Sequence, residues 1–164
     1  MARALVAMGA NAGARARTLA AASATVGRLP LTRVVRASRL RETDPESPRD
    51  GGPFLNGALL LETALSPRAL LRELLTLERR FGRRRAPGER GGPRALDLDL
   101  ILHEGHTARG AGLTLPHPRF RGRRFVLEPA AEVAPQLRDP HSGRTVAELW
   151  AALTRAKPRT RGRA

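Results

Sequence analysis

Two aspartates two residues apart, Asp97 and Asp99, are the clearest candidates for chemistry in this 164-residue chain. They lie in residues 95–102, a run that is predicted to form a strand. Alternate side chains of a strand face the same way, so the two aspartates share one face and the leucines at 96, 98 and 100 share the other. Carboxylates about 6–7 Å apart repel each other, and strands disfavour aspartate. A Mg²⁺ ion would resolve this conflict, although a solvated outer face explains the pair alone equally well.

An arginine- and glycine-rich segment, residues 83–93, immediately precedes this strand. Guanidinium groups bind phosphates in a bidentate manner, so the segment and the two aspartates together suit a polyphosphate with two Mg²⁺ ions. The segment could be a lid that closes over ATP or a solvated basic loop that contacts RNA. The chain has no Walker A motif, and its one lysine, Lys157, lies near the C-terminus. Any ATP chemistry would therefore depend on metal and arginine.

The overall composition indicates an anionic partner without naming it. The net charge is +15, which favours nucleic acids, phosphates or an anionic membrane surface. With one Trp, four Phe and no Tyr, a platform for stacking bases would be thin. The absence of cysteine excludes disulfides and thiolate chemistry, and no apolar run is long enough to span a bilayer. We therefore expect a cytoplasmic protein with no membrane partner.

The N-terminal forty residues, rich in Ala and Arg, have the composition of a transit peptide. The same bias runs through the whole chain, however, and a strand is predicted from residue 3. We therefore favour a folded N-terminus over a cleaved presequence.

Strands and helices alternate along the chain. Strands are predicted at 3–8, 31–41, 54–63 and 95–102, with a short one near 113–115. Helices are predicted at about 14–28, 67–81, 122–127 and 145–155. Ser66 and Pro67 form a typical helix start, and Gly82 a typical stop. The short connections within 31–63 favour an antiparallel pair and hence an α+β fold. We expect one domain over residues 1–156 and a disordered basic tail over 157–164.

Two further polar positions allow more than one reading. Glu78 falls inside the apolar face of the predicted helix 67–81, either as an edge carboxylate that pairs with a neighbouring arginine or as an acid directed inward at a cationic site. His117 lies between prolines in an arginine-rich segment, which suits a phosphate contact. The other histidines, His103, His106 and His141, are expected at the surface.

Several motifs, in the same order along the chain, resemble the 6-hydroxymethyl-7,8-dihydropterin pyrophosphokinase family of folate biosynthesis. Residues 90–101, Arg-Gly-Gly-Pro-Arg-Ala-Leu-Asp-Leu-Asp-Leu-Ile, fit its signature. Gly9-Ala10-Asn11 resembles its Gly-Ser-Asn turn, and residues 38–45 resemble Ser-Ser-Leu-Tyr-Glu-Thr-Glu-Pro. Phe54-Leu55-Asn56, residues 113–117 and Arg123-Arg124-Phe125 match later motifs. The resemblance covers about residues 3–155.

The resemblance implies a ferredoxin-like α+β sandwich with a mainly antiparallel sheet. It implies transfer of pyrophosphate from Mg-ATP to the pterin hydroxymethyl group, which yields AMP and the pterin diphosphate. Two Mg²⁺ ions would bind Asp97 and Asp99. By resemblance, the catalytic residues are Arg83, Arg94, Asp97, Asp99 and Arg123; ATP contacts Arg85, Leu100, Thr114 and His117; and the pterin contacts Thr43, Pro45, Phe54, Asn56 and Phe125. Glu78 also falls at a family position, which favours the inward reading.

The expected partners are ATP and the pterin, without nucleic acid, and the expected state is a monomer. The rival interpretation is a basic RNA-binding domain of ferredoxin-like topology without catalysis. It explains the charge and the arginines, but not why two aspartates share a strand face beside them.

Some positions depart from the family pattern. Gly91 replaces a usual Trp, Arg41 a usual Tyr, and Ala10 a usual Ser. Glu46-Ser47 stands where a Val-Gly-like pair is usual, and Gly112 where some members have a basic residue. The metal and pterin-stacking positions are intact, so we expect an active enzyme.

Overall fold

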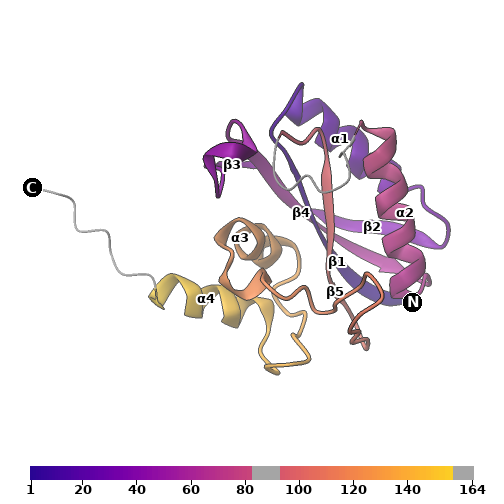
Figure 1. Cartoon of the computed structure of the whole chain (residues 1–164). Coiled ribbons are helices and arrows are strands. Elements are labelled where there is room, and N and C mark those ends of the chain that lie inside the picture. The colour runs from indigo at the N-terminus through magenta and orange to yellow at the C-terminus, as the bar shows by residue number, and fades with distance from the viewer. Residues whose placement is uncertain (83–92, 157–164) are drawn as a thin grey trace, which may run out of the picture.

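The computed structural model describes residues 1–82 and 93–156 (Figure 1). The strands are β1 (Ala2–Ala10), β2 (Thr32–Ala37), β3 (Arg41–Thr43), β4 (Phe54–Thr63) and β5 (Asp97–His103). The helices are α1 (Arg15–Val26), α2 (Pro67–Arg80), α3 (Arg124–Val133) and α4 (Val146–Ala156), with 3₁₀ turns at Pro48–Asp50 and Phe120–Gly122. In these described ranges no helix is long and apolar enough to cross a membrane. The tail at 157–164 lies outside the described residues.

The five strands form one sheet in which every described pair is antiparallel. The order is β2-β4-β1-β5, and β3 pairs with the start of β4. Strands β1 and β4 are central and pair over their whole lengths, from Ala2 opposite Thr63 to Ala10 opposite Leu55. This arrangement confirms the ferredoxin-like α+β sandwich that the sequence predicted.

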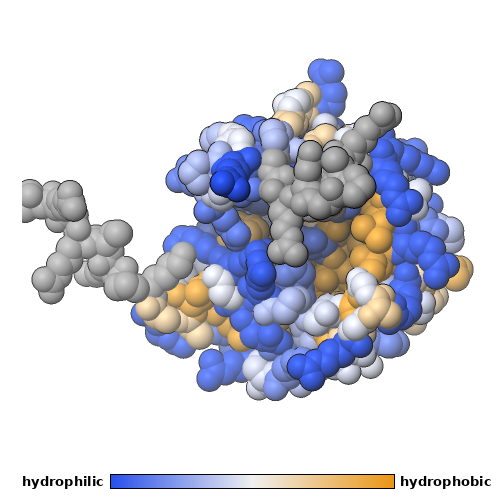
Figure 2. Space-filling model, in the orientation of Figure 1, coloured by the Kyte–Doolittle hydropathy of each residue, from blue (hydrophilic) through white to orange (hydrophobic). Residues whose placement is uncertain are grey.

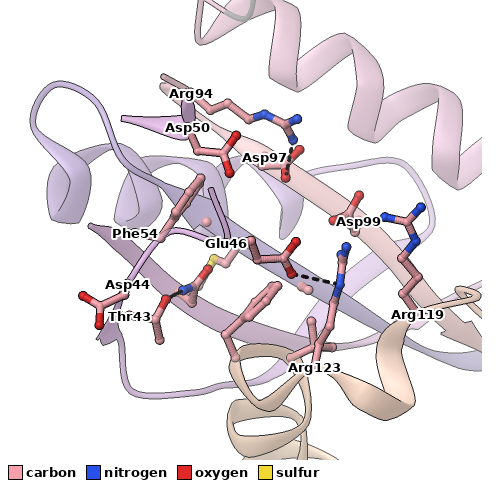
Figure 3. A pocket seen from close by; sticks show the side chains of 16 residues that line it. Thr43, Asp44, Glu46, Asp50, Phe54, Arg94, Asp97, Asp99, Arg119 and Arg123 are labelled. Atoms are coloured by element: carbon pink, nitrogen blue, oxygen red, sulfur yellow. Dashed lines mark hydrogen bonds and ion pairs between the residues drawn. The ribbon is translucent and has the colours of Figure 1, made fainter. Parts of the chain in front are cut away.

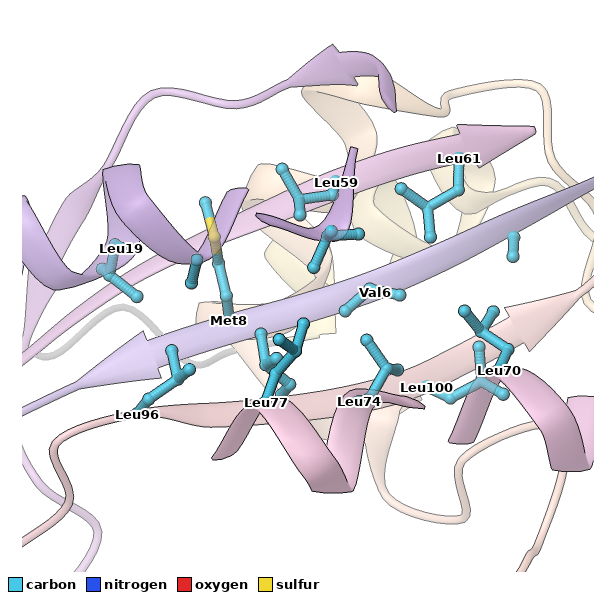
Figure 4. Close-up of a cluster of buried hydrophobic side chains, with 14 of the residues drawn as sticks. Val6, Met8, Leu19, Leu59, Leu61, Leu70, Leu74, Leu77, Leu96 and Leu100 are labelled. Atoms are coloured by element: carbon cyan, nitrogen blue, oxygen red, sulfur yellow. The ribbon is translucent and has the colours of Figure 1, made fainter. Parts of the chain in front are cut away.

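Helices α1 and α2 cover one face of the sheet (Figures 1 and 4). Val6 and Met8 of β1 lie in this core with leucines of β4, β5 and both helices. Helix α2 begins as predicted: the Ser66 hydroxyl accepts a hydrogen bond from the Ala69 N–H, and Pro67 occupies the first turn. It ends just before Gly82, whose φ of +94° suits glycine.

Helices α3 and α4 pack on the opposite face. Their apolar side chains form a second core with Leu5 of β1 and Ala58 and Leu60 of β4. Helix α3 spans ten residues and begins at Arg124, so it is longer than the short helix that the sequence predicted at 122–127. The helix covers only part of this face, and the uncovered end near Ala7 and Gly9 borders a cavity.

A β-bulge in β5 changes which side chains face each core. Leu102 lies opposite Leu5, whereas Leu100 lies opposite Val6, so Ile101 is the extra residue. His103 therefore lies opposite Ala4 and is buried, with its Nε2 atom 3.0 Å from the Leu65 carbonyl oxygen. The surface position predicted for His103 is wrong, whereas His106 and His141 are exposed as predicted.

Hydrophilic side chains cover most of the face seen in Figure 2, and apolar residues gather in smaller areas. This distribution is expected for a chain with 30 Lys and Arg residues and a net charge of +15. The short strand predicted near 113–115 is limited to a bridge between Leu115 and Ala108.

Candidate active site

A cavity of about 260 Å³ opens where α3 leaves the sheet uncovered (Figure 3). Strands β1, β3, β4 and β5 supply its floor and one wall, and the segment that leads into α3 supplies the other. Eight residues predicted from the sequence line it: Thr43, Phe54, Asn56, Arg94, Asp97, Asp99, Arg123 and Phe125. The fold thus gathers side chains that lie up to 82 positions apart in the chain.

The two aspartates share one face of β5, as the alternation predicted. Leu96, Leu98 and Leu100 are buried in the core on the opposite face. On β1, Ala7 lies opposite Asp99 and Gly9 lies opposite Asp97. Because these β1 residues are small, the cavity extends over them and leaves space beside both carboxylates.

Arg94 is fixed at one end of the carboxylate pair. Its Nη1 atom donates a hydrogen bond of 2.9 Å to Asp97 Oδ2. Its backbone is held by Asn11, whose Oδ1 accepts from the Arg94 N–H at 2.6 Å and whose N–H donates to the Arg94 carbonyl at 2.9 Å. The Gly9-Ala10-Asn11 turn therefore positions an arginine that is distant in sequence.

The electrostatics of the pair favour a cation. Burial, and then the charges of Asp97 and Glu78, raise the pKa of Asp99 to about 7, against the opposing effect of Arg123 and Arg94. Glu78 is buried and accepts a hydrogen bond of 2.7 Å from the Leu98 N–H. It thus lies inward, on the opposite side of β5 from the cavity-facing aspartates.

The donor chemistry fits magnesium. In residues 1–82 and 93–156, no group of three or more His, Cys, Asp or Glu side chains is placed to hold a metal ion. Mg²⁺ commonly binds through one or two carboxylates and completes its shell with substrate phosphates and water. Two adjacent carboxylates that open into a cavity match that mode of binding.

An aromatic and polar wall faces the aspartates across the cavity. The Asn56 Nδ2 atom donates to Thr43 Oγ1 at 2.5 Å, which links β4 to β3. Phe54 lies two residues before Asn56 on the same face of β4. Gly9 lies beneath this wall, and a Cβ atom there would be 2.8 Å from Asn56 Oδ1. A larger residue at position 9 would therefore displace the amide.

The opposite wall belongs to the beginning of α3. The Arg123 guanidinium lies 5.4 Å from the centre of the Phe125 ring, within the range of a cation–π contact. The Arg123 Nε atom also lies 3.3 Å from Glu46 Oε1. Figure 3 shows Arg123 and Phe54 on opposite sides of the cavity. The two walls leave a slot with an aromatic ring on each side.

Sequence reasoning missed four charged residues of the cavity: Asp44, Glu46, Asp50 and Arg119. The first three lie in the loop after β3, which folds inward because the Asn11 amide donates to the Asp50 and Gly52 carbonyl oxygens. Arg119 extends towards Asp99 (Figure 3). The only sequence signal for it was its position two residues after His117.

Of the remaining predicted residues, those in the described ranges do not line the cavity. Thr114 and Pro45 lie outside it, and the side chain of Leu100 packs in the core, so contact with ATP could come only from its backbone. Arg83 and Arg85, and with them the predicted lid, lie outside the described residues. These assignments stay predictions.

His117 lies near the cavity without lining it. Its N–H donates to the Ile101 carbonyl oxygen, and its Nδ1 atom accepts from the Arg119 N–H at 3.2 Å. Burial, then Arg123 and Arg119, lower the pKa of His117. A neutral ring that accepts at Nδ1 carries its proton on Nε2. His117 would thus be able to donate one hydrogen bond from Nε2.

Comparison with known proteins decides the family. A family model described as 7,8-dihydro-6-hydroxymethylpterin-pyrophosphokinase (HPPK) matches residues 5–135. This chain belongs to the HPPK family. Family membership makes it an ATP-dependent pyrophosphokinase, which is a transferase, as the sequence predicted. The RNA-binding alternative is not supported.

Several curated relatives are named 2-amino-4-hydroxy-6-hydroxymethyldihydropteridine pyrophosphokinase. One from Synechocystis sp. is 41% identical over 149 residues, which cover 89% of this chain and 73% of the relative. One from Methylorubrum extorquens is 40% identical and covers 93% of this chain and 94% of the relative. One from Pseudomonas aeruginosa is 41% identical, with coverage of 92% and 91%.

The fold also matches a solved structure. A chain from "Crystal Structure Analysis of the HPPK-DHPS in complex with substrates" aligns with a TM-score of 0.71 and 11% sequence identity. The alignment covers 94% of this chain and 44% of that one, so this chain spans less than half of its length. At this identity the match shows a shared fold.

Proposed function

We propose that this protein transfers pyrophosphate from Mg-ATP to the hydroxymethyl group of 6-hydroxymethyl-7,8-dihydropterin. The hydroxymethyl oxygen attacks the β-phosphorus, and the bond from that phosphorus to the oxygen it shares with the α-phosphorus breaks. AMP leaves with the bridging oxygen, and the hydroxyl proton is released. The observation that carries the proposal is one cavity that joins a carboxylate pair to a slot between two aromatic rings.

The aromatic slot suits the pterin. A flat heterocycle would stack between Phe54 and Phe125, and two well-placed rings are enough for one such ligand. Asn56 presents an amide whose position is fixed by Thr43, and this amide would hydrogen-bond to the polar edge of the ring. Pro45 and Thr43 would add backbone contacts at the same edge.

The opposite end of the cavity suits the triphosphate. Asp97 and Asp99 would hold two Mg²⁺ ions, which neutralise phosphate charge when bound. Arg94 is fixed beside Asp97, whereas Arg119 and Arg123 approach from the α3 side, so cations flank the carboxylates on two sides. Transfer would then rest on positioning and charge neutralisation.

His117 would support the same phosphates. Its neutral ring would donate from Nε2 to a phosphate oxygen, while the Arg119 N–H holds the ring in place through Nδ1. Thr114 and the backbone of Leu100 are further candidates for contact with ATP.

The decisive experiment measures AMP release from Mg-ATP with and without the pterin. We expect AMP only when the pterin is present, and a loss of at least about a hundredfold in Asp97→Asn because one metal-binding charge is removed. Glu62→Gln is the matched control, because Glu62 is a carboxylate of the central strand β4 that pairs with exposed Arg33, away from the cavity. Absence of AMP in the wild type with both substrates would refute the proposal, and full activity of Asp97→Asn would refute the metal role.

A further inference from the structure

The two walls of the proposed pterin slot come from separate parts of the fold. One wall includes Thr43 of β3, a strand of only three residues at the end of the sheet. The other includes Phe125 at the beginning of α3. A stacked ligand requires the distance between these walls to be held, so contacts that join β3 to α3 bear directly on the slot.

Arg41 makes that connection. Its Nη1 atom donates to Glu132 Oε2 at 2.9 Å and to the Arg39 carbonyl oxygen at 3.3 Å, and its Nε atom lies 3.6 Å from Glu128 Oε1. Both glutamates belong to α3. Glu132 also accepts from the Arg39 N–H with both oxygens, at 3.1 and 3.3 Å. The Arg39 backbone and the Arg41 side chain, two residues apart, thus both bind the Glu132 carboxylate.

Strand geometry couples Arg41 to the substrate wall. Arg41 and Thr43 alternate with Glu42, so they lie on the same face of β3. The register places Arg41 opposite Asn56 and Thr43 opposite Phe54. A displacement of Arg41 away from α3 would therefore move the neighbours that fix the Asn56 amide and the Phe54 ring.

The other face of β3 has a separate attachment. The Arg15 Nη2 atom at the start of α1 donates to Glu42 Oε2 at 2.9 Å, and its Nη1 atom donates to the Pro53 carbonyl oxygen at 2.8 Å. This contact and the pairing with β4 keep β3 on the sheet without Arg41. Loss of the Arg41 side chain would thus remove the direct link from β3 to α3 and leave the fold intact, with the Arg39 N–H still bonded to Glu132.

We propose that Arg41 is a positioning residue that ties β3 to α3 through Glu132 and so holds the Thr43 and Asn56 wall at a fixed distance from Phe125. The proposal rests on the proposed function, because it assigns a task at the same site. Arg41 is 23% exposed, whereas Arg33 in the surface pair with Glu62 is 68% exposed, so solvent competes less for the Arg41 guanidinium. The α3 glutamates act as its fixed partners.

The test is direct binding of 6-hydroxymethylpterin, followed by fluorescence, in the presence of Mg²⁺ and α,β-methylene-ATP, which cannot be cleaved at the reacting bond. Arg41→Met keeps the length and the apolar stem of the side chain and removes its charge. We expect the pterin Kd to rise on the order of fivefold, as loss of one well-placed ion-pair network allows. The Kd of the ATP analogue should change less than about twofold, because the phosphate side is untouched.

Two controls separate positioning from a general loss of stability. Arg33→Met removes the exposed Arg33–Glu62 pair of the same sheet, which lies away from the cavity, so any loss of Tm that it causes should come without a change in pterin affinity. Glu132→Gln should weaken pterin binding like Arg41→Met. The double variant should bind the pterin no more weakly than the weaker-binding single variant, because both substitutions break the same link.

Each outcome bears on the proposal. Unchanged pterin affinity in Arg41→Met, with a wild type that binds the pterin, would overturn the positioning role and leave the proposed function standing. Additive losses in the double variant would also overturn it. A wild type that binds the ATP analogue but no pterin would overturn it together with the proposed substrate.

Discussion

The ion pair between Arg121 and Asp139 offers a quantitative test of the structure. Asp139 is fully buried and accepts two hydrogen bonds from Arg121, of 2.6 and 2.7 Å, and one of 2.7 Å from the Ser142 hydroxyl. Burial opposes ionisation, but these bonds and the His141 N–H outweigh it and lower the pKa of Asp139 to about 2. The pair anchors the segment that carries Arg119 to the turn before α4.

The contribution of Asp139 to the free energy of unfolding follows from this pKa. The ordinary value is 3.8, and each pKa unit corresponds to about 1.4 kcal/mol, so ionised Asp139 contributes about 2 kcal/mol to the free energy of unfolding. Arg121 is 31% exposed, so solvent partly compensates for the loss of its partner. We therefore expect Asp139→Asn to cost about 2 kcal/mol at pH 7, below the 3–5 kcal/mol typical of a fully buried pair.

The sign of the pH dependence is fixed as well. Because the pKa is lower in the folded state, this contribution is complete above about pH 5 and is lost as the pH falls through 3.8 towards 2. The difference between wild type and Asp139→Asn should shrink to about half at pH 3. Urea unfolding of both proteins at pH 7, 5 and 3 measures this difference.

Glu62→Gln is the matched control, since it removes an exposed ion pair and should cost less than about 1 kcal/mol at every pH. A difference for Asp139→Asn that stays below about 0.5 kcal/mol at pH 7, or that grows as the pH falls, would refute the reasoning.

Three further predictions concern the cavity and the core. Gly9→Ala places a Cβ atom 2.8 Å from Asn56 Oδ1, so the pterin Kd should rise about tenfold while the affinity for the ATP analogue is kept. An equal loss of affinity for both ligands in fluorescence titrations would contradict this prediction. Arg119→Ala removes a cation beside Asp99 and should raise the ATP-analogue Kd about tenfold in calorimetric titration, whereas Arg155→Ala, at the exposed end of α4, should not change it. Equal effects of the two substitutions would mean that the overall positive charge of the chain, and not Arg119 itself, attracts the ATP analogue. Leu74→Ala empties a fully buried position between α2 and the sheet and should cost about 3 kcal/mol in urea unfolding; a loss below about 1 kcal/mol would mean that the core differs from Figure 4.

Local patterns determined most of the secondary structure. The apolar run after the Pro- and Gly-rich loop gave β4 its bounds, Phe54–Thr63, as predicted. Ser66 and Pro67 gave the start of α2, because capping depends on residues within one turn. The period of two in residues 95–102 placed Asp97 and Asp99 opposite three buried leucines. Such features depend on neighbours in sequence, so the sequence alone reveals them.

The sequence by itself also determined the family, because its motifs and their order were readable without a structure. Only the tertiary structure decided which distant side chains meet. The bulge at Ile101 turned His103 inward, and the Asn11 amide drew the loop with Glu46 and Asp50 over the cavity. Arg41 found its partners on α3, some ninety residues away. Contacts of this kind depend on register and packing between elements, which the periodicity of a single element does not encode.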